Sequence, residues 1–86
     1  MDVRDGIRGV LRTHGRLGAD PSTLRDDDDL YDAGMTSHSS VNVMLGLEGH
    51  FNIEFPDRML KRSVFETVAS MQAAIEELLR EREREQ

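Results

Sequence analysis

The sequence predicts an all-α fold of three main helices and one short helix, with a long loop after the first helix. Apolar residues recur at helical spacing in three segments, residues 3–17, 37–51 and 67–79. Between the first two segments the composition changes to turn-forming residues. The chain has 86 residues, of which 37% are apolar, and this is enough for one small hydrophobic core. We therefore expect a single domain over residues 1–86.

The first helix is expected over residues 3–17. Val3, Ile7 and Val10 lie three or four positions apart, and Leu11 adjoins the same apolar stripe. Another side of this helix carries an arginine at every fourth position: Arg4, Arg8, Arg12 and Arg16. We interpret the arginine row as a solvated helix face, with contact to a partner as the alternative.

Residues 18–36 are expected to form the long loop, because the helical periodicity stops there and turn chemistry takes over. So long an irregular stretch is unusual in a small domain, and we expect Leu24, Leu30 and Tyr31 to pin it against the helices. A single helical turn is expected at residues 29–33. The four consecutive aspartates lack the alternate spacing and central glycine of a calcium-binding loop, so no metal site is expected.

The second main helix begins at a cluster of hydroxyl side chains, which can cap free backbone amides, and it runs to about residue 51. Two of its faces are apolar, with Val43, Leu47 and Phe51 on one and Val41 and Leu45 on the other. We expect the first face in the core and the second toward solvent or a partner. The alternative is that the long loop covers both. The expected core comprises Ile7, Val10, Leu11, Val43, Leu47, Phe51, Ile75 and Leu78.

After the second helix the sequence predicts one short turn and the last main helix. The turn is expected at residues 57–60, with Met59 and Leu60 directed inward. Thr67 can cap the last helix, whose apolar residues follow helical spacing. Residues 81–86 alternate in charge and are expected to form a frayed, solvated end.

Composition excludes several classes of function. Eleven basic residues against 17 acidic residues give a net charge of -6, which disfavours binding to nucleic acid or to an anionic membrane. No cysteine is present, so the chain has neither a disulfide nor a thiol nucleophile. No apolar run approaches the roughly 20 residues of a membrane span, and acidic residues stand where a signal peptide would be basic. We expect a soluble, cytoplasmic protein.

Ser37 stands in the first turn of the second helix, on the face of Val41 and Leu45. Free N–H groups and the helix dipole favour a bound or attached anion there. The alternative is that Ser37 is one of several capping hydroxyls. A hydrolase is not expected, because His38 cannot face its neighbour Ser37 on a helix. His38 and His50 would lie roughly 18 Å apart on one continuous helix, so they could not share a metal ion or a substrate.

Two motifs resemble those of the acyl and peptidyl carrier protein family. The first is Asp-Leu-Tyr-Asp-Ala-Gly-Met-Thr-Ser at residues 29–37, followed by the apolar positions of the second helix. The second is Phe-Asn-Ile-Glu-Phe-Pro-Asp at residues 51–57, followed by Thr67-Val68 before the last helix. Family members typically read D-L-x-x-L-G-x-D-S-L, F-x-I-x-I-P-D and Thr-Val at these places. The resemblance extends over about residues 3–79.

The resemblance implies a four-helix bundle with one short helix and no catalytic activity. By the same resemblance, Ser37 receives 4′-phosphopantetheine from coenzyme A, and this arm holds an acyl or aminoacyl group as a thioester. The implied partners are a phosphopantetheinyl transferase, an acyl- or aminoacyl-activating ligase and a downstream acceptor enzyme, and the carrier itself is expected to be a monomer. The alternative is an unmodified helical interaction module that resembles a carrier.

The chain departs from the family pattern beside the serine. Thr36 and His38 stand where the family usually has Asp and Leu. The resemblance implies that modifying enzymes commonly recognise these two positions. The second helix also lacks the acidic rows of fatty-acid carriers, since Glu48 is its one acidic residue. We therefore expect an atypical stand-alone carrier, with an amino acid as the candidate cargo, rather than the carrier of a fatty-acid synthase. The expected partner-binding residues are Thr36, His38, Val41 and Leu45.

Overall fold

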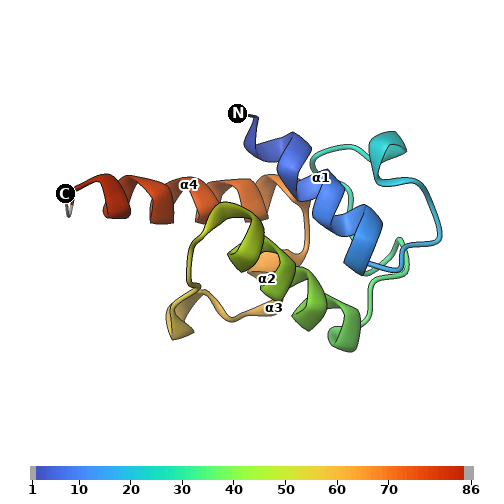
Figure 1. Ribbon diagram of the computed structural model, residues 1–86. Helices are drawn as coiled ribbons and strands as arrows, with labels where there is room; N and C mark the ends of the chain where they lie inside the picture. Colours follow the sequence, from blue (N-terminus) through green and yellow to red (C-terminus); the bar gives the residue numbers. More distant parts are fainter. Residues whose placement is uncertain (1, 85–86) are drawn as a thin grey trace.

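The computed structural model describes residues 2–84, whose regular elements are all helical. In chain order these are α1 (Val3–His14), the 3-10 turn η1 (Pro21–Thr23), α2 (Ser37–Phe51), the 3-10 turn η2 (Asp57–Met59), α3 (Arg62–Phe65) and α4 (Val68–Arg84). α1 packs against α2 and α4, and α3 packs against α4. Figure 1 shows the long loop at one end of the bundle and the last turns of α4 projecting from the other. The all-α, four-helix prediction is confirmed.

The core lies between α1, α2 and α4. All eight residues expected in the core are buried: Ile7, Val10, Leu11, Val43, Leu47, Phe51, Ile75 and Leu78. Burial of such side chains supplies about 1.5 to 3 kcal/mol each and is the main force that assembles the helices. Leu30 from the long loop is fully buried, and Leu24 and Tyr31 pack against the same core. The loop is therefore pinned by the three side chains that were expected to pin it.

Close contact between α1 and α2 explains a glycine inside a helix. A Cβ atom added at Gly46 would lie 2.8 Å from Cγ1 of Val10 and 2.8 Å from Cδ2 of His14. Carbon atoms do not approach so closely, so a larger residue would force the Val10 and His14 side chains, or the helix itself, to shift. This contact fixes the rotation of α2 against α1 and leaves the opposite side of α2 facing outward.

Arg8 fastens the long loop to α1. Its guanidinium donates hydrogen bonds to the carbonyl oxygens of Pro21 and Leu24 and pairs with the carboxylate of Asp26. The interpretation of the arginine row as a solvated face is therefore wrong for Arg8, because the loop carbonyls face its side chain. The guanidinium groups of Arg4 and Arg8 also hold the pKa of Asp26 below its ordinary value.

Other boundaries differ from the expected ones. α1 ends at His14 instead of residue 17, since the chain turns at Gly15 and Arg16 takes a left-handed conformation with φ 53°. The turn η1 was not predicted, and the side chain of Asp20 caps it by accepting a hydrogen bond from the Ser22 N–H. At residues 30–34 the chain forms turns, and the Ala33 N–H donates to the Asp29 carbonyl at 3.2 Å, as in one turn of helix.

The turn η2 lies within the expected residues 57–60, and the short helix α3 follows it at residues for which the sequence predicted no element. Met59 is buried as predicted, but Leu60 is 48% exposed, so the expected inward direction of Leu60 is wrong. The turn η2 ends at Met59, and the chain then leads Leu60 toward α2 instead of into the core. At the end of α4, residues 81–84 are helical instead of frayed, and Glu81 pairs with Arg58 at 3.1 Å. Residues 85 and 86 lie outside the described part of the chain.

Candidate functional site

A capping box starts α2 and fixes the backbone at Ser37. The Thr36 hydroxyl accepts a hydrogen bond from the Ser39 N–H at 3.0 Å, and the Ser39 hydroxyl accepts one from the Thr36 N–H at 2.8 Å. Ahead of it, Gly34 has φ +120°, a conformation that residues with a side chain rarely adopt. The glycine turn and the capping box together place Ser37 at the first helical position.

The Ser37 side chain is exposed and available for chemistry. Ser39 is buried in the capping box, and the Ser40 hydroxyl donates to the Ser37 carbonyl at 2.8 Å. Within residues 2–84 no hydrogen bond occupies the Ser37 hydroxyl itself. The side chains of Thr36 and Ser39 therefore cap the N-terminus of α2. The alternative, in which Ser37 is a capping hydroxyl, is wrong.

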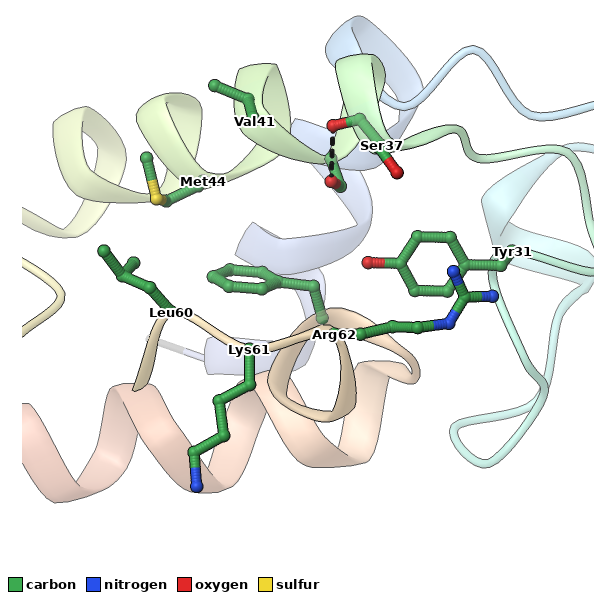
Figure 2. Close-up of a pocket in the computed structure, with 9 residues that line it drawn as sticks. Tyr31, Ser37, Val41, Met44, Leu60, Lys61 and Arg62 are labelled. Carbon is green, nitrogen blue, oxygen red and sulfur yellow. Dashed lines mark hydrogen bonds between the residues drawn. The ribbon is translucent and has the colours of Figure 1, made fainter. Parts of the chain in front are cut away.

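Ser37 borders an open groove of about 420 Å³ between α2 and the segment from Leu60 to Phe65. Most of its lining is apolar, and Tyr31 closes the end next to Ser37, as Figure 2 shows. The lining residues are Tyr31, Ser37, Ser40, Val41, Met44, Leu60, Lys61, Arg62 and Phe65. The groove thus starts at the Ser37 side chain and continues along α2.

The second wall of this groove is a feature that the sequence analysis missed. Leu60 was expected to point inward, and neither Lys61 nor Arg62 was singled out. Figure 2 shows the Arg62 side chain running toward Tyr31, and its guanidinium lies 3.8 Å from the centre of the Tyr31 ring. The sequence offered one sign of this wall, because Lys61 and Arg62 are two adjacent cations in a chain with a net charge of -6.

The outward face of α2 carries the expected partner-binding residues. Val41 is 51% exposed and Leu45 is 55% exposed, so the alternative in which the loop covers both faces of α2 is wrong. We call these two residues the apolar strip. His38 is exposed near its head. Glu48 is half-buried, and its carboxylate accepts a hydrogen bond from the Phe55 N–H at 2.9 Å, so it holds the chain after α2.

The site suits a phosphate ester attached to Ser37. The first N–H groups of a helix have no partner within the helix, and the capping box satisfies only the N–H groups of Thr36 and Ser39. A negative charge on the Ser37 oxygen would therefore meet free donors and the positive end of the α2 dipole. The open groove leaves room beside it for an extended substituent. Ser37 is thus a hydroxyl with space and donors for a phosphorylated group.

The rest of the described chain shows no candidate metal centre and no candidate membrane span. No group of three or more His, Asp or Glu side chains between residues 2 and 84 is arranged to hold a metal ion. Over the same residues, no helix is both long and apolar enough to cross a bilayer. The surface at Ser37 and the groove is therefore the candidate site.

A protein-family profile described as "Phosphopantetheine attachment site" matches residues 13–78. The aminoacyl carrier protein of Agrobacterium fabrum is 40% identical over 73 residues, which span 85% of this chain and 88% of that protein. The D-alanyl carrier protein of Leuconostoc mesenteroides is 32% identical over 79 residues, which span 92% of this chain and 99% of that protein.

A similar chain is also found among solved structures. It occurs in the crystal structure of an engineered Bradyrhizobium japonicum glycine:[carrier protein] ligase complexed with a carrier protein from Agrobacterium tumefaciens and ATP. The two chains superpose with a TM-score of 0.85 at 37% identity, over 87% of this chain and 97% of the other. The likeness therefore extends over most of the helical bundle.

Proposed function

Because the chain belongs to the phosphopantetheine attachment-site family, we propose that Ser37 is its attachment serine and that it carries an amino acid. A member of this family is a carrier and not an enzyme, and its cofactor is 4′-phosphopantetheine. One observation supports Ser37 above its neighbours. Ser37 combines exposure, a free hydroxyl and a place at the mouth of the groove, whereas Ser39 is buried in the capping box.

The residues around Ser37 prepare it for modification. The attached arm supplies the thiol on which cargo is held as a thioester, a group that the cysteine-free chain lacks. The Thr36–Ser39 capping box holds the serine backbone in one position. The first turn of α2 stabilises the negative charge that the modified oxygen bears. The chain itself thus presents and orients the arm without reacting with the cargo.

Several observations favour an amino acid over a fatty acyl group as cargo. Glu48 is the one acidic residue of α2, and it is engaged with the Phe55 N–H. An enzyme that recognises acidic rows on a carrier would find none on this helix. Relatives at 40% and 32% identity are named for aminoacyl and D-alanyl groups. The proposed ligase is therefore an aminoacyl-activating enzyme.

The remaining parts of the proposal concern partners and setting. A phosphopantetheinyl transferase would modify Ser37, and a downstream enzyme would accept the cargo. The similar carrier chain was solved with an ATP-bound ligase. Loading by such an ATP-dependent enzyme would take place in the cytoplasm, with this chain acting as a single-domain monomer.

Mapping the modification tests the proposed function. The apo-protein is incubated with coenzyme A, Mg²⁺ and a broad-specificity phosphopantetheinyl transferase, and the adduct is located by peptide mass spectrometry. We expect a single adduct on Ser37. An adduct on Ser39 or Ser40, or none with several transferases, would favour an unmodified interaction module instead. The intact mass of the protein from its native host would show the arm together with any cargo.

The apolar strip is expected to dock the loading enzyme. Val41 and Leu45 are half-exposed on the side of α2 that carries Ser37, so an enzyme that contacts them also meets the root of the arm. Loss of an apolar anchor in a small interface costs about 1 to 2 kcal/mol, or roughly 5- to 30-fold in affinity. Leu45→Asp in the holo-protein should therefore raise the KM for aminoacyl loading by about that factor.

Ala73→Asp is the matched control, because it adds the same charge at an exposed position of α4. It should load normally. Raised salt should also have little effect, because charges matter less than apolar contact at this surface. Normal loading of Leu45→Asp, or its unfolding in circular dichroism, would show that the strip is not the docking surface. A collapse of loading in modest salt would point instead to the aspartate run or the arginine row.

A further inference from the structure

Arg62 is a fixed cation at the Ser37 end of the groove. Its guanidinium stacks on the Tyr31 ring at 3.8 Å, and Arg62, Tyr31 and Ser37 all line the same groove. Within residues 2–84 no acidic side chain pairs with Arg62. By contrast, Arg8 and Arg58 each form ion pairs with carboxylates. Arg62 is therefore held in place by an aromatic ring, and its charge has no acidic partner in the described chain.

The neighbouring residue Lys61 has the same charge but a different direction. Figure 2 shows its side chain pointing away from Ser37, whereas the Arg62 side chain runs beneath Ser37 toward Tyr31. Lys61 also borders a second groove, together with Arg58 and Arg80. The two adjacent cations thus differ in direction and not in formal charge, so Lys61 is a matched control for Arg62.

We infer that Arg62, oriented by Tyr31, pairs with the phosphodiester on Ser37 and so directs the attached arm along the apolar groove. This inference rests on the proposed function, in which Ser37 bears the arm. A phosphodiester carries one negative charge, and the planar guanidinium offers it two parallel N–H donors. Stacking on Tyr31 restricts Arg62 before the arm is attached, so less side-chain entropy is lost on pairing.

The charge of the whole protein strengthens the case for a local cation. The chain has a net charge of -6, so a further anion at its surface meets an unfavourable field. An unpaired guanidinium beside the anion offsets that field locally. Beyond Arg62 the groove is lined by Val41, Met44 and Leu60, which offer apolar contact to an arm that leaves Ser37 in this direction. Arg62 is accordingly a positioning residue for the arm.

Side-chain NMR of the apo- and holo-proteins tests the inference directly. We expect the Arg62 Nε–Hε signal to shift when apo-protein is converted to holo-protein, and NOEs to connect the arm with Met44 and Leu60. An exposed ion pair changes an equilibrium by about 1.4- to 5-fold. Arg62→Gln should therefore weaken the arm-to-groove NOEs by up to about that factor, whereas Lys61→Gln, at a residue that lines the same groove but points away from Ser37, should weaken them less.

A third variant examines the role of the ring. Tyr31→Leu removes the stacking surface and should weaken the same NOEs through Arg62. Should Tyr31→Leu fail to fold, the comparison of Arg62→Gln with Lys61→Gln still tests the inference. Both of those side chains are exposed, so neither replacement should disturb the fold. An unshifted Arg62 signal, equal effects of the two cation variants, or full NOEs in a folded Tyr31→Leu protein would overturn the inference.

The modification state separates this inference from the proposed function. Each sample is checked by mass for an adduct on Ser37 before NMR measurement. Absence of an adduct in the wild-type protein would contradict the proposed function itself. A full adduct together with an unresponsive Arg62 would leave the carrier function standing and would overturn only the positioning role.

Discussion

The Ser37→Ala protein should remain without an adduct under conditions that fully modify the wild-type protein, and it should accept no cargo. Alanine has no oxygen to form the phosphate ester. The neighbouring hydroxyls cannot replace it, because Ser39 is only 2% exposed and Ser40 donates its hydroxyl to the Ser37 carbonyl. Intact-mass measurement after incubation with coenzyme A and transferase checks this outcome. An adduct on the variant would show that the attachment residue has been misidentified.

Stability measurements separate this loss from a folding defect. Ser37 is exposed and takes no part in the capping box, so its replacement by a good helix former should change the free energy of unfolding by less than about 0.5 kcal/mol. Ser39→Ala is the converse control. It leaves the Thr36 N–H without its partner and should cost about 1 to 3 kcal/mol, yet it should still be modified on Ser37.

The two faces of α2 were predictable because helical geometry alone assigns them. Val43 and Leu47 are four residues apart and must share a side, and Val41 and Leu45 must share another. A small domain has room to bury only one such side. In the structure Gly46 lies on the buried side, where α1 approaches closely enough to exclude a Cβ atom. Local periodicity and one packing argument were therefore sufficient for the exposed strip.

The groove and the hydrogen bonds from Arg8 to the long loop depend on tertiary contacts, which helical periodicity does not predict. Arg8 has the same spacing as Arg4 and Arg12, and only the path of the loop places carbonyl groups against it. The direction of Leu60 depends on where the turn η2 ends. The turn ends at Met59, one residue earlier than expected, so Leu60 lies outside it. The cation at the site was missed for the same reason, because Tyr31 and Arg62 meet only through the tertiary fold.

Replacement of Leu47 by alanine should destabilise the domain more than any change on the outward face. The Leu47 side chain has no exposed surface, and it lies on the core side of α2 with Val43 and Phe51. A buried Leu→Ala change costs about 2 to 5 kcal/mol, because transfer energy is lost and a cavity remains. Small domains have only about 5 to 15 kcal/mol of stability in total, so this is a large fraction of it.

Leu45→Ala provides the matched comparison, since it makes the same chemical change two residues away on a side chain that is 55% exposed. It should cost no more than about 0.5 kcal/mol, as expected for a surface position. In urea, with a slope of about 1 kcal/mol per molar for so small a domain, the Leu47→Ala midpoint should fall by about 2 M or more. The Leu45→Ala midpoint should remain close to that of the wild-type protein. A large shift for Leu45→Ala with none for Leu47→Ala would mean that α2 is rotated by half a turn. The strip beside Ser37 would then belong to the core and could not dock an enzyme.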